Sequence, residues 1–263
     1  MTKEKMSMIL TTKRGIDSLK PLFVATDKNT ELIIVDDDYN DETKIWLAKQ
    51  KGYERIVYVP IKESSQTHQR TFSQGLNTAL LYAENKWIIR ADDNLEFKSD
   101  FFNVVREDIQ TFIENLGNEN FVIIGQKVWE ELHHQKWEDY SGFSGGRHIQ
   151  IRNPRFTFSF GIFPINLVYA LNGYDERYDC GWGREDVQFL HRLMISGYQA
   201  FFDREMFGFS RQHTPKRDTL PITEILYQMD SLEITNGKTR AFNPFDLKEL
   251  QKQYLVNKDT FII

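Results

Sequence analysis

Short, mainly apolar runs divide the first hundred residues of the chain into strands separated by more polar segments. These runs cover residues 6–10, 31–35, 55–59 and 87–89, and their polar members are Ser7, Glu31 and Arg55. An unbroken apolar run indicates a strand that is buried on both faces, as in a parallel sheet. Apolar residues spaced three and four apart lie between the later runs, as a helix requires. The alternation of strands and helices therefore predicts an α/β fold.

Four helices are expected from this spacing. The first begins near Asp41, with Ile45 and Ala48 facing the core and Gly52 as its left-handed stop. The other three cover residues 71–83, 101–116 and 185–195. Further strands are expected at 121–125 and 156–163, and a polar, helical tail beyond residue 218. Residues 129–155 show no clean period, so we expect a long functional loop in which His133, His134 and His148 are ordinary polar residues.

Two pairs of adjacent carboxylates carry the chemistry that the sequence offers. Asp92 and Asp93 follow the fourth apolar run, and Glu185 and Asp186 open a helix, where backbone amides favour their ionised forms. Ligands of open α/β sheets bind at the carboxyl ends of the strands. The side chains expected to converge there are Thr12, Asp37, Asp92 and Asp93. One pair suited to metal and phosphate and another suited to proton transfer indicate an enzyme.

Composition and charge exclude several classes of protein. With 263 residues, 40% of them hydrophobic, the chain can bury a sizeable core, which excludes disorder as its main state. A formal net charge of -5 disfavours nucleic acid as a partner, although a local basic stripe would not appear in the total. Cys180 is the only cysteine, which excludes an intrachain disulfide and a thiolate zinc site. No stretch reaches the length of a membrane span or signal peptide, so we expect a cytoplasmic protein, with peripheral membrane contact left open.

The motifs occur in the order and approximate spacing of GT-A glycosyltransferases, and they resemble the family-2 type most. The resemblance spans about residues 6–215 and rests on the segments 7–12, 33–37, Asn77, 87–94, 172–176 and 181–186. The last segment is also similar to the acidic motif of galactosyl- and N-acetylgalactosaminyltransferases. The resemblance implies a GT-A fold, a Rossmann-like mixed sheet flanked by helices. It also implies one large domain, 1–218, with a nucleotide-binding half (1–98), an acceptor and catalytic half (99–218) and a helical extension (219–263).

The resemblance implies a set of roles on the donor side. Thr12 and Asp37 would hold the uridine half of a UDP-sugar, with Asp37 accepting from the uracil N–H. The segment 92–94 takes the place of the DXD motif, with Asn94 where the last Asp is usual. Asp93 is then the candidate ligand of Mn²⁺ or Mg²⁺, and Asp92 the candidate partner of ribose or sugar hydroxyls.

Basic residues and one histidine complete the donor side. Arg14 and Arg211 are candidates for holding the donor, Arg211 as a clamp on the diphosphate oxygens. His213 is the second candidate metal ligand; the alternative is a surface histidine in a solvated basic turn. The family often has Gly and Ser after the Asp pair at 36–37, whereas this chain has Asp38 and Tyr39. Because of this departure from the family pattern, the turn beside the uridine need not follow the family's form.

On the acceptor side, an inverting transferase needs one carboxylate within reach of the acceptor hydroxyl. Asp186 is the first candidate for this catalytic base and Glu185 the second, with the other member holding a sugar hydroxyl. The alternative is that one of them is only a helix N-terminal charge. Trp182 is a candidate platform for a sugar face, or else an aromatic packed over the core. Asp175 and Glu176 are expected to organise their turn.

The leading interpretation is therefore a metal-dependent, inverting glycosyltransferase that uses a UDP-sugar. A retaining GT-A transferase is one alternative, because the acidic motif also resembles that of some retaining enzymes. A nucleotidyltransferase normally has a Gly-rich, basic phosphate loop, which residues 11–15 lack. A catalytically inactive carbohydrate-binding module is disfavoured by the joint presence of Asp93, Glu185 and Asp186. The acceptor stays open among a glycan, a lipid-linked precursor, a protein and a modified nucleobase.

Overall fold

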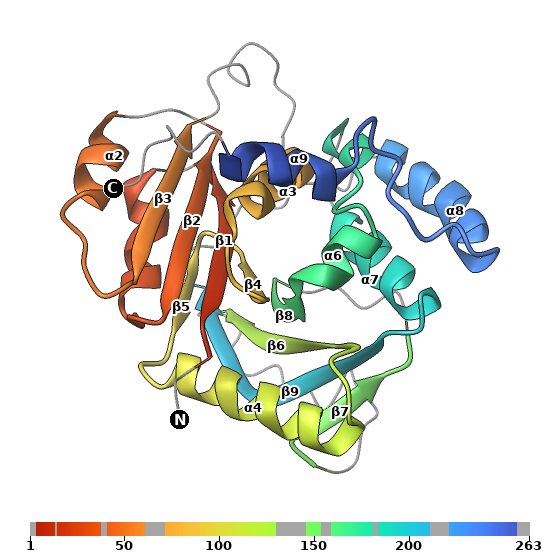
Figure 1. Ribbon diagram of the computed structural model, residues 1–263, viewed down its shortest axis with the longest axis horizontal. Helices are drawn as coiled ribbons and strands as arrows, with labels where there is room; N and C mark the ends of the chain where they lie inside the picture. The colour runs from red at the N-terminus through yellow and green to blue at the C-terminus, as the bar shows by residue number, and fades with distance from the viewer. Residues whose placement is uncertain are drawn as a thin grey trace.

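The computed structural model describes residues 4–13, 15–37, 41–60, 72–129, 146–153, 159–180, 184–210 and 221–256. Within these residues the predicted α/β class is confirmed, because one mixed sheet carries helices on both faces (Figure 1). The strand order is β3-β2-β1-β4-β8-β6-β9-β5, with β7 beside β9.

The parallel part of the sheet comes from the first hundred residues. Its strands are β1 (Met6–Thr12), β2 (Thr30–Asp36), β3 (Arg55–Pro60) and β4 (Trp87–Ala91). Every residue of β1, β2 and β4 is buried. Helices cover both faces here, and for this reason the sequence shows unbroken apolar runs in place of alternation.

The second half of the sheet is mixed. Its strands are β5 (Leu95–Phe97), β6 (Phe121–Trp129), β7 (His148–Ile151), β8 (Phe160–Pro164) and β9 (Gln199–Ser210). β8 runs antiparallel to β4, while β6 and β9 pair in parallel with a register shift after Gly125. A Cβ atom at Gly125 would lie 2.1 Å from the Phe160 ring, so only glycine fits at this irregular point.

Two hydrophobic cores fill the two sides of the sheet. One lies beneath α3 (Phe72–Tyr82), α6 (Ile165–Ala170) and α7 (Glu185–Ile195). The other lies beneath α1 (Ile16–Leu19), the 3-10 helix η1 (Lys20–Phe23), α2 (Asp41–Leu47) and α4 (Phe101–Leu116). Figure 1 shows α4 on the side of the sheet opposite α3. The helices predicted at 101–116 and 185–195 are confirmed to the residue.

Two details of the sequence-based interpretation are wrong. In α2 the buried residues are Thr43 and Leu47, whereas Ile45 is 56% exposed and Ala48 is exposed beyond the helix end. Ile45 lies midway between the two buried positions and therefore on the opposite side of the helix. Gly52 has φ +113°, but it belongs to the turn before β3 and does not end α2.

The expected loop at 129–155 contains a strand. His148 lies in β7, which pairs antiparallel with β9, so its interpretation as a loop residue is wrong. β7 does alternate, with Ile149 and Ile151 buried between polar residues, but four residues are too few for the alternation to stand out in the sequence. His133 and His134 lie outside the described residues.

The polar tail is helical, as expected, and packs on the rest of the chain. It contains α8 (Pro221–Thr235) and α9 (Leu247–Val256). Leu247 is buried in the core beneath α3, and Gln251 Nε2 donates to the Ala83 carbonyl at 2.8 Å. Figure 1 shows α9 lying against α3. Among the helices described, none combines the length and the apolar character needed to cross a membrane.

Candidate active site

The carboxyl ends of the parallel strands bring the predicted donor-side residues together. Thr12 ends β1, and its Oγ1 donates to Asp93 Oδ2 at 2.9 Å. The Asp37 backbone N–H donates to the Thr12 carbonyl at 2.9 Å. Asp93 is 9% exposed, and its hydrogen bond to Thr12 joins the ends of β1 and β4. The Thr12 and Asp93 side chains therefore meet at the strand ends, and the Asp37 backbone lies beside them.

Asp92, the neighbour of Asp93, is paired with an arginine that sequence reasoning missed. Arg90 Nη2 lies 3.0 Å from Asp92 Oδ1, and the guanidinium stacks over the Phe72 ring, 5.0 Å from its centroid. Arg90 is only 2% exposed although it carries a charge. A charged residue inside the apolar run of β4 was the available signal, because charged side chains are buried only with partners.

Arg90 also faces the second pair of carboxylates. Burial by itself lowers the pKa of Arg90, but attraction from Asp92, Tyr174, Asp186 and Glu185 outweighs burial and raises the pKa above its usual value. The buried guanidinium therefore stays charged. The guanidinium is attracted both by the strand-end residue Asp92 and by the acidic start of α7.

Glu185 and Asp186 occupy the first turn of α7, as predicted. Arg184 precedes them in a left-handed conformation, with φ +77°, and pairs with Glu224 of α8 at 2.7 Å. Asp186 Oδ1 accepts a hydrogen bond from the Val187 backbone N–H at 2.8 Å. The first turn of the helix thus supplies a hydrogen-bond donor to this carboxylate.

The turn at 172–176 fixes the position of α7 from within the core. Asn77 of α3 is 2% exposed and makes reciprocal hydrogen bonds with Tyr174: its Nδ2 donates to the carbonyl at 2.9 Å, and its Oδ1 accepts from the N–H at 2.8 Å. The same Nδ2 donates to Glu176 Oε1 at 2.9 Å. The Tyr174 ring stacks on Phe189 of α7, with centroids 4.4 Å apart. Glu176 therefore organises the turn, as expected.

The C-terminal tail also makes hydrogen bonds to the turn at 172–176. Asn243 Nδ2 donates to the carbonyls of Asn172 and Tyr174, both at 2.8 Å, and the Leu247 N–H donates to Asn172 Oδ1 at 2.8 Å. Asp175 accepts from Arg177 at 2.7 Å. No sequence motif marked Asn243, because its partners lie about seventy residues away along the chain.

The 3-10 helix η4 (Glu176–Cys180) places a carboxylate at the start of α3. Asp179 Oδ1 accepts from the Ser73 N–H at 2.7 Å, and Oδ2 accepts from the Gln74 N–H at 2.9 Å. These are amide groups of the first helical turn, which need partners from outside the helix. Burial raises the pKa of Asp179 to about 7.

The donor set at the strand ends suits a divalent metal. Asp93 offers a carboxylate, the hard oxygen ligand that Mg²⁺ and Mn²⁺ prefer. Asn94, in the place of the usual last Asp, is 4% exposed, and its Nδ2 donates to Ser210 Oγ at 3.0 Å. Asn94 thus links the segment after β4 to the end of β9. Four other predicted residues lie outside the described residues: Arg14, Trp182, Arg211 and His213.

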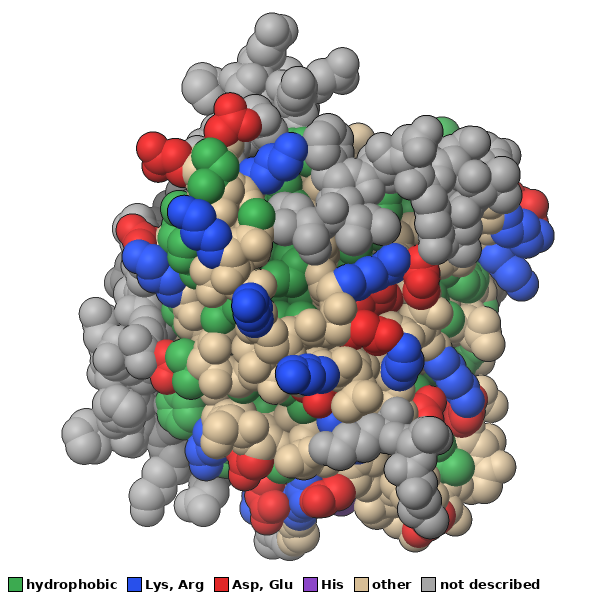
Figure 2. All heavy atoms as spheres, turned by 60° about the vertical axis from the view of Figure 1, so that its left-hand side comes forward, with side chains coloured by type: hydrophobic (Ala, Val, Ile, Leu, Met, Phe, Trp, Pro, Cys, Tyr) green, Lys and Arg blue, Asp and Glu red, His purple; other side chains and the backbone are tan. Residues whose placement is uncertain are grey.

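On one face of the described part of the chain, the charged side chains are mixed in sign (Figure 2). On the face drawn in Figure 2, the coloured Lys and Arg side chains are interspersed with Asp and Glu and form no broad basic area. Surfaces that follow a phosphate backbone gather Lys and Arg.

A mixed sheet with carboxylates at its parallel strand ends, and a second acidic pair at the start of a helix, has the GT-A architecture. The chain belongs to glycosyl transferase family 2, which its sequence matches over residues 10–167, more than half its length. It is a glycosyltransferase. No curated protein matches the sequence.

Solved structures of low sequence identity share the fold. The chain superposes on TarS 1–349 from S. aureus, in complex with UDP-GlcNAc, with a TM-score of 0.65 at 13% identity, covering 95% of this chain and 71% of that one. For the mannosyltransferase PcManGT from Pyrobaculum calidifontis, in complex with GDP-Man and Mn²⁺, the TM-score is 0.58 at 16% identity, covering 96% and 70%. A further structure of TarS 1–349 gives a TM-score of 0.58 at 14% identity; there the match covers 79% of this chain but only 60% of that one.

Proposed function

We propose that this chain transfers a sugar from a UDP-sugar to an acceptor hydroxyl, with a divalent metal and with inversion at the anomeric carbon. The observation that carries the proposal is the position of Arg90, whose buried charge interacts with Asp92 on the donor side and with Glu185 and Asp186 on the other. Support for a nucleotide-sugar donor comes from the fold shared with TarS, in complex with UDP-GlcNAc, and with PcManGT, in complex with GDP-Man and Mn²⁺.

The donor side of the proposal uses the ends of β1, β2 and β4. Thr12 and Asp37 would hold the uridine, and Asp92 would bind ribose or sugar hydroxyls. Asp93 would hold Mn²⁺ or Mg²⁺, which when bound neutralises charge on the diphosphate leaving group. The further donor-side candidates from the sequence are Arg14 and Arg211 for the donor and His213 for the metal. The nucleotide-binding half is then residues 1–98, and the acceptor half 99–218.

The acceptor side uses the start of α7. Asp186 takes the proton of the acceptor hydroxyl while the oxygen attacks the anomeric carbon. The bond between that carbon and the phosphate oxygen breaks, and the nucleotide leaves with the electron pair. Arg90 favours the ionised form of nearby carboxylates, which a base requires. Glu185 would hold a sugar hydroxyl, and Trp182 would provide a platform for the acceptor sugar.

Release of the nucleoside diphosphate tests this function. The purified protein is incubated with UDP-GlcNAc, UDP-glucose, UDP-galactose or GDP-mannose, with Mn²⁺ or EDTA, and free UDP and GDP are measured. We expect Mn²⁺-dependent release of UDP, by slow hydrolysis when no acceptor is added. Release of GDP alone would indicate a GDP-sugar as the donor. Formation of UTP or GTP when pyrophosphate is added to the same donors would indicate a nucleotidyltransferase. No turnover and no binding of any donor would contradict the proposal.

The stereochemistry is tested once an acceptor is found. A single displacement converts an α-linked donor into a β-linked product, which the coupling constant of the anomeric proton reports by NMR. An α-linked product would favour a retaining transferase and would leave Asp186 as a residue that positions the acceptor.

A further inference from the structure

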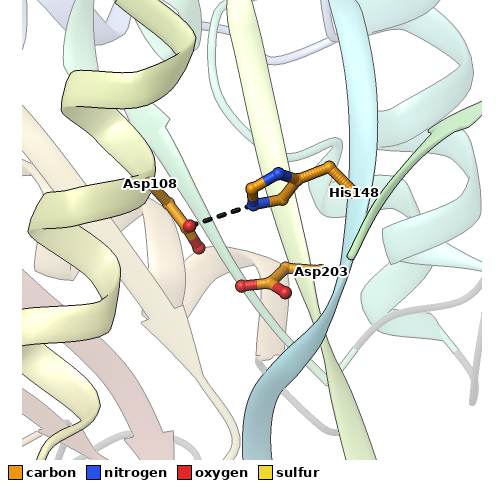
Figure 3. A group of neighbouring side chains, drawn as sticks. All are labelled: Asp108, His148 and Asp203. Atoms are coloured by element: carbon orange, nitrogen blue, oxygen red, sulfur yellow. Dashed lines mark hydrogen bonds and ion pairs between the residues drawn. The ribbon is translucent and has the colours of Figure 1, made fainter. Parts of the chain in front are cut away.

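A second cluster of metal-ligating side chains lies between α4, β7 and β9, apart from the strand ends described above. Asp108 comes from α4, His148 from β7 and Asp203 from β9, and Figure 3 shows the three pointing toward a common point. One ligand atom of each residue lies within 4.8 Å of the other two. The β6 partners of Asp203 and Ser210 are Gly125 and Trp129, which are four residues apart along β6, roughly 13 Å at strand spacing. The cluster is therefore separate from the contact between Asn94 and Ser210.

The cluster is buried and carries more negative than positive charge. Asp108 is 1% exposed and Asp203 0%. Their only positively charged partner within the described part of the chain is Arg147, whose Nη2 lies 2.7 Å from Asp108 Oδ1 and 3.0 Å from Asp203 Oδ2. Glu205 is a third carboxylate on the same arginine, at 3.4 Å. One guanidinium therefore faces two buried carboxylates and a third at the surface.

One buried oxygen in the cluster lacks a partner. Asp108 Oδ1 contacts His148 Nε2 at 3.0 Å and Arg147, but Asp108 Oδ2 accepts no hydrogen bond from the described residues. A buried carboxylate oxygen without a donor is costly, and such atoms are rare in native proteins. Burial and Asp203 raise the pKa of Asp108 to about 9, which favours a proton at this point when no ion is bound; a cation at the centre of the cluster would take the place of that proton and give Oδ2 a partner.

We propose that Asp108, His148 and Asp203 bind a divalent cation of the Zn²⁺ or Mn²⁺ class. Two carboxylate oxygens and one imidazole nitrogen form a ligand set that these ions accept, and solvent could complete the coordination beside His148, whose side chain is 23% exposed. His148 Nε2 gives up its contact with Asp108 Oδ1 to ligate the ion. Arg147 Nη2 bridges Asp108 and Asp203, and with the ion bound it would keep its contact with Asp203 and give up the one with Asp108.

The position of the cluster indicates what the ion does. Within the described residues β7 pairs with β9 alone, and His148 stands directly opposite Asp203 in that pairing. The ion therefore fastens an edge strand to the helix on the other side of the cluster, α4. This is a stabilising site that requires no nucleotide, in contrast to the donor-side metal at Asp93.

Metal binding without nucleotide tests the proposal. Protein without a histidine tag is stripped with EDTA, dialysed and titrated with Zn²⁺ or Mn²⁺ by calorimetry, and its thermal midpoint is followed in parallel. We expect one ion per chain and a raised midpoint. Asp108→Asn and His148→Gln should each weaken binding at least tenfold; His148→Gln, at a partly exposed site, covers the case in which Asp108→Asn does not fold.

Two controls separate this site from the donor site. Asp100→Asn removes an exposed carboxylate just before α4, one that makes no capping hydrogen bond, and should leave binding unchanged. Asp93→Ala should also leave the nucleotide-free binding unchanged while it removes metal-dependent UDP binding. The proposal is overturned if the wild-type protein binds neither ion without nucleotide, if Asp93→Ala abolishes the binding, or if both cluster variants retain it.

Discussion

Replacing Asn77 by alanine should cost the protein roughly 3 kcal/mol of stability. The substitution removes three hydrogen bonds of 2.8–2.9 Å from a side chain that is 2% exposed. The Tyr174 carbonyl keeps Asn243 as a donor, so its loss is small. The buried Tyr174 N–H loses its acceptor, at about 1–3 kcal/mol, and Glu176 loses a donor to its carboxylate, at about 1 kcal/mol. For a chain of this length, we expect the thermal midpoint to fall by about 6–12 °C.

Asn77→Asp separates the donor role of this side chain from its acceptor role. The introduced carboxyl can still accept from the Tyr174 N–H, but an oxygen replaces the amide donor that faces the Tyr174 carbonyl and Glu176. Burial and the neighbouring carboxylate raise the folded-state pKa of the introduced group above its unfolded value. The folded state then binds its proton more tightly, so stability is highest below about pH 4 and falls as pH rises through the folded pKa.

Urea unfolding followed by tryptophan fluorescence measures both variants at pH 5 and pH 8. At pH 8 the aspartate variant should be less stable than the alanine variant. At pH 5 the difference in stability between the two variants should be smaller or of opposite sign. Asn236→Ala, at an exposed asparagine whose side chain makes no hydrogen bond to the described residues, is the matched control and should change stability by less than about 0.5 kcal/mol. A loss below about 1 kcal/mol for Asn77→Ala would refute the argument that this side chain holds the turn.

Four further predictions concern the site and its supports. Asp93→Ala should abolish Mn²⁺-dependent UDP binding, measured by calorimetry, and leave the fold intact; UDP affinity insensitive to the substitution and to EDTA would count against the metal assignment. Asp186→Asn should lower turnover by roughly a hundredfold or more while donor binding persists; undiminished turnover would leave the residue a structural role. Arg90→Met should lower turnover and move the acidic limb of the pH–rate profile to higher pH, because carboxylates near the site lose their cation; Arg90→Lys should recover part of the loss, and an unmoved profile would argue against electrostatic coupling. Burial raises the pKa of Asp179 from 3.8 to about 7, so the folded state binds that proton more tightly and unfolding free energy should fall as pH rises from about 4 to 7; Asp179→Asn should flatten that dependence in urea titrations, and equal slopes in both proteins would contradict it.

The parallel strands and the strand-end carboxylates could be predicted because burial on both faces leaves a simple signal. β9 could not, since it mixes buried and exposed positions and carries Asp203, Arg204 and Glu205 in its middle. β5 is three residues long, below the length at which a pattern can be recognised. In α2 an exposed isoleucine suggested the wrong buried face.

Side chains whose role depends on distant partners were the hardest to predict. Arg90 and Asn243 act through residues elsewhere in the chain, and a sequence without spatial information does not show those pairs. The contacts of His148 could not be predicted for the same reason, because Asp108 and Asp203 lie forty and fifty-five residues away along the chain. Strand-end positions follow from topology, but buried polar networks depend on the tertiary packing that brings their members together.

The hydrogen bonds between the tail and the turn at 172–176 make these two segments one cooperative unit. Asn243 and the Leu247 N–H satisfy backbone and side-chain groups that the turn cannot satisfy by itself. Local unfolding of the tail would therefore expose those groups and loosen the turn before the parallel sheet opens. Since Tyr174 packs on Phe189, the start of α7 would lose its support in the same event. The contacts of the tail thus contribute to the opening free energy of α7, and slow amide exchange in the tail and in α7 should share one rate.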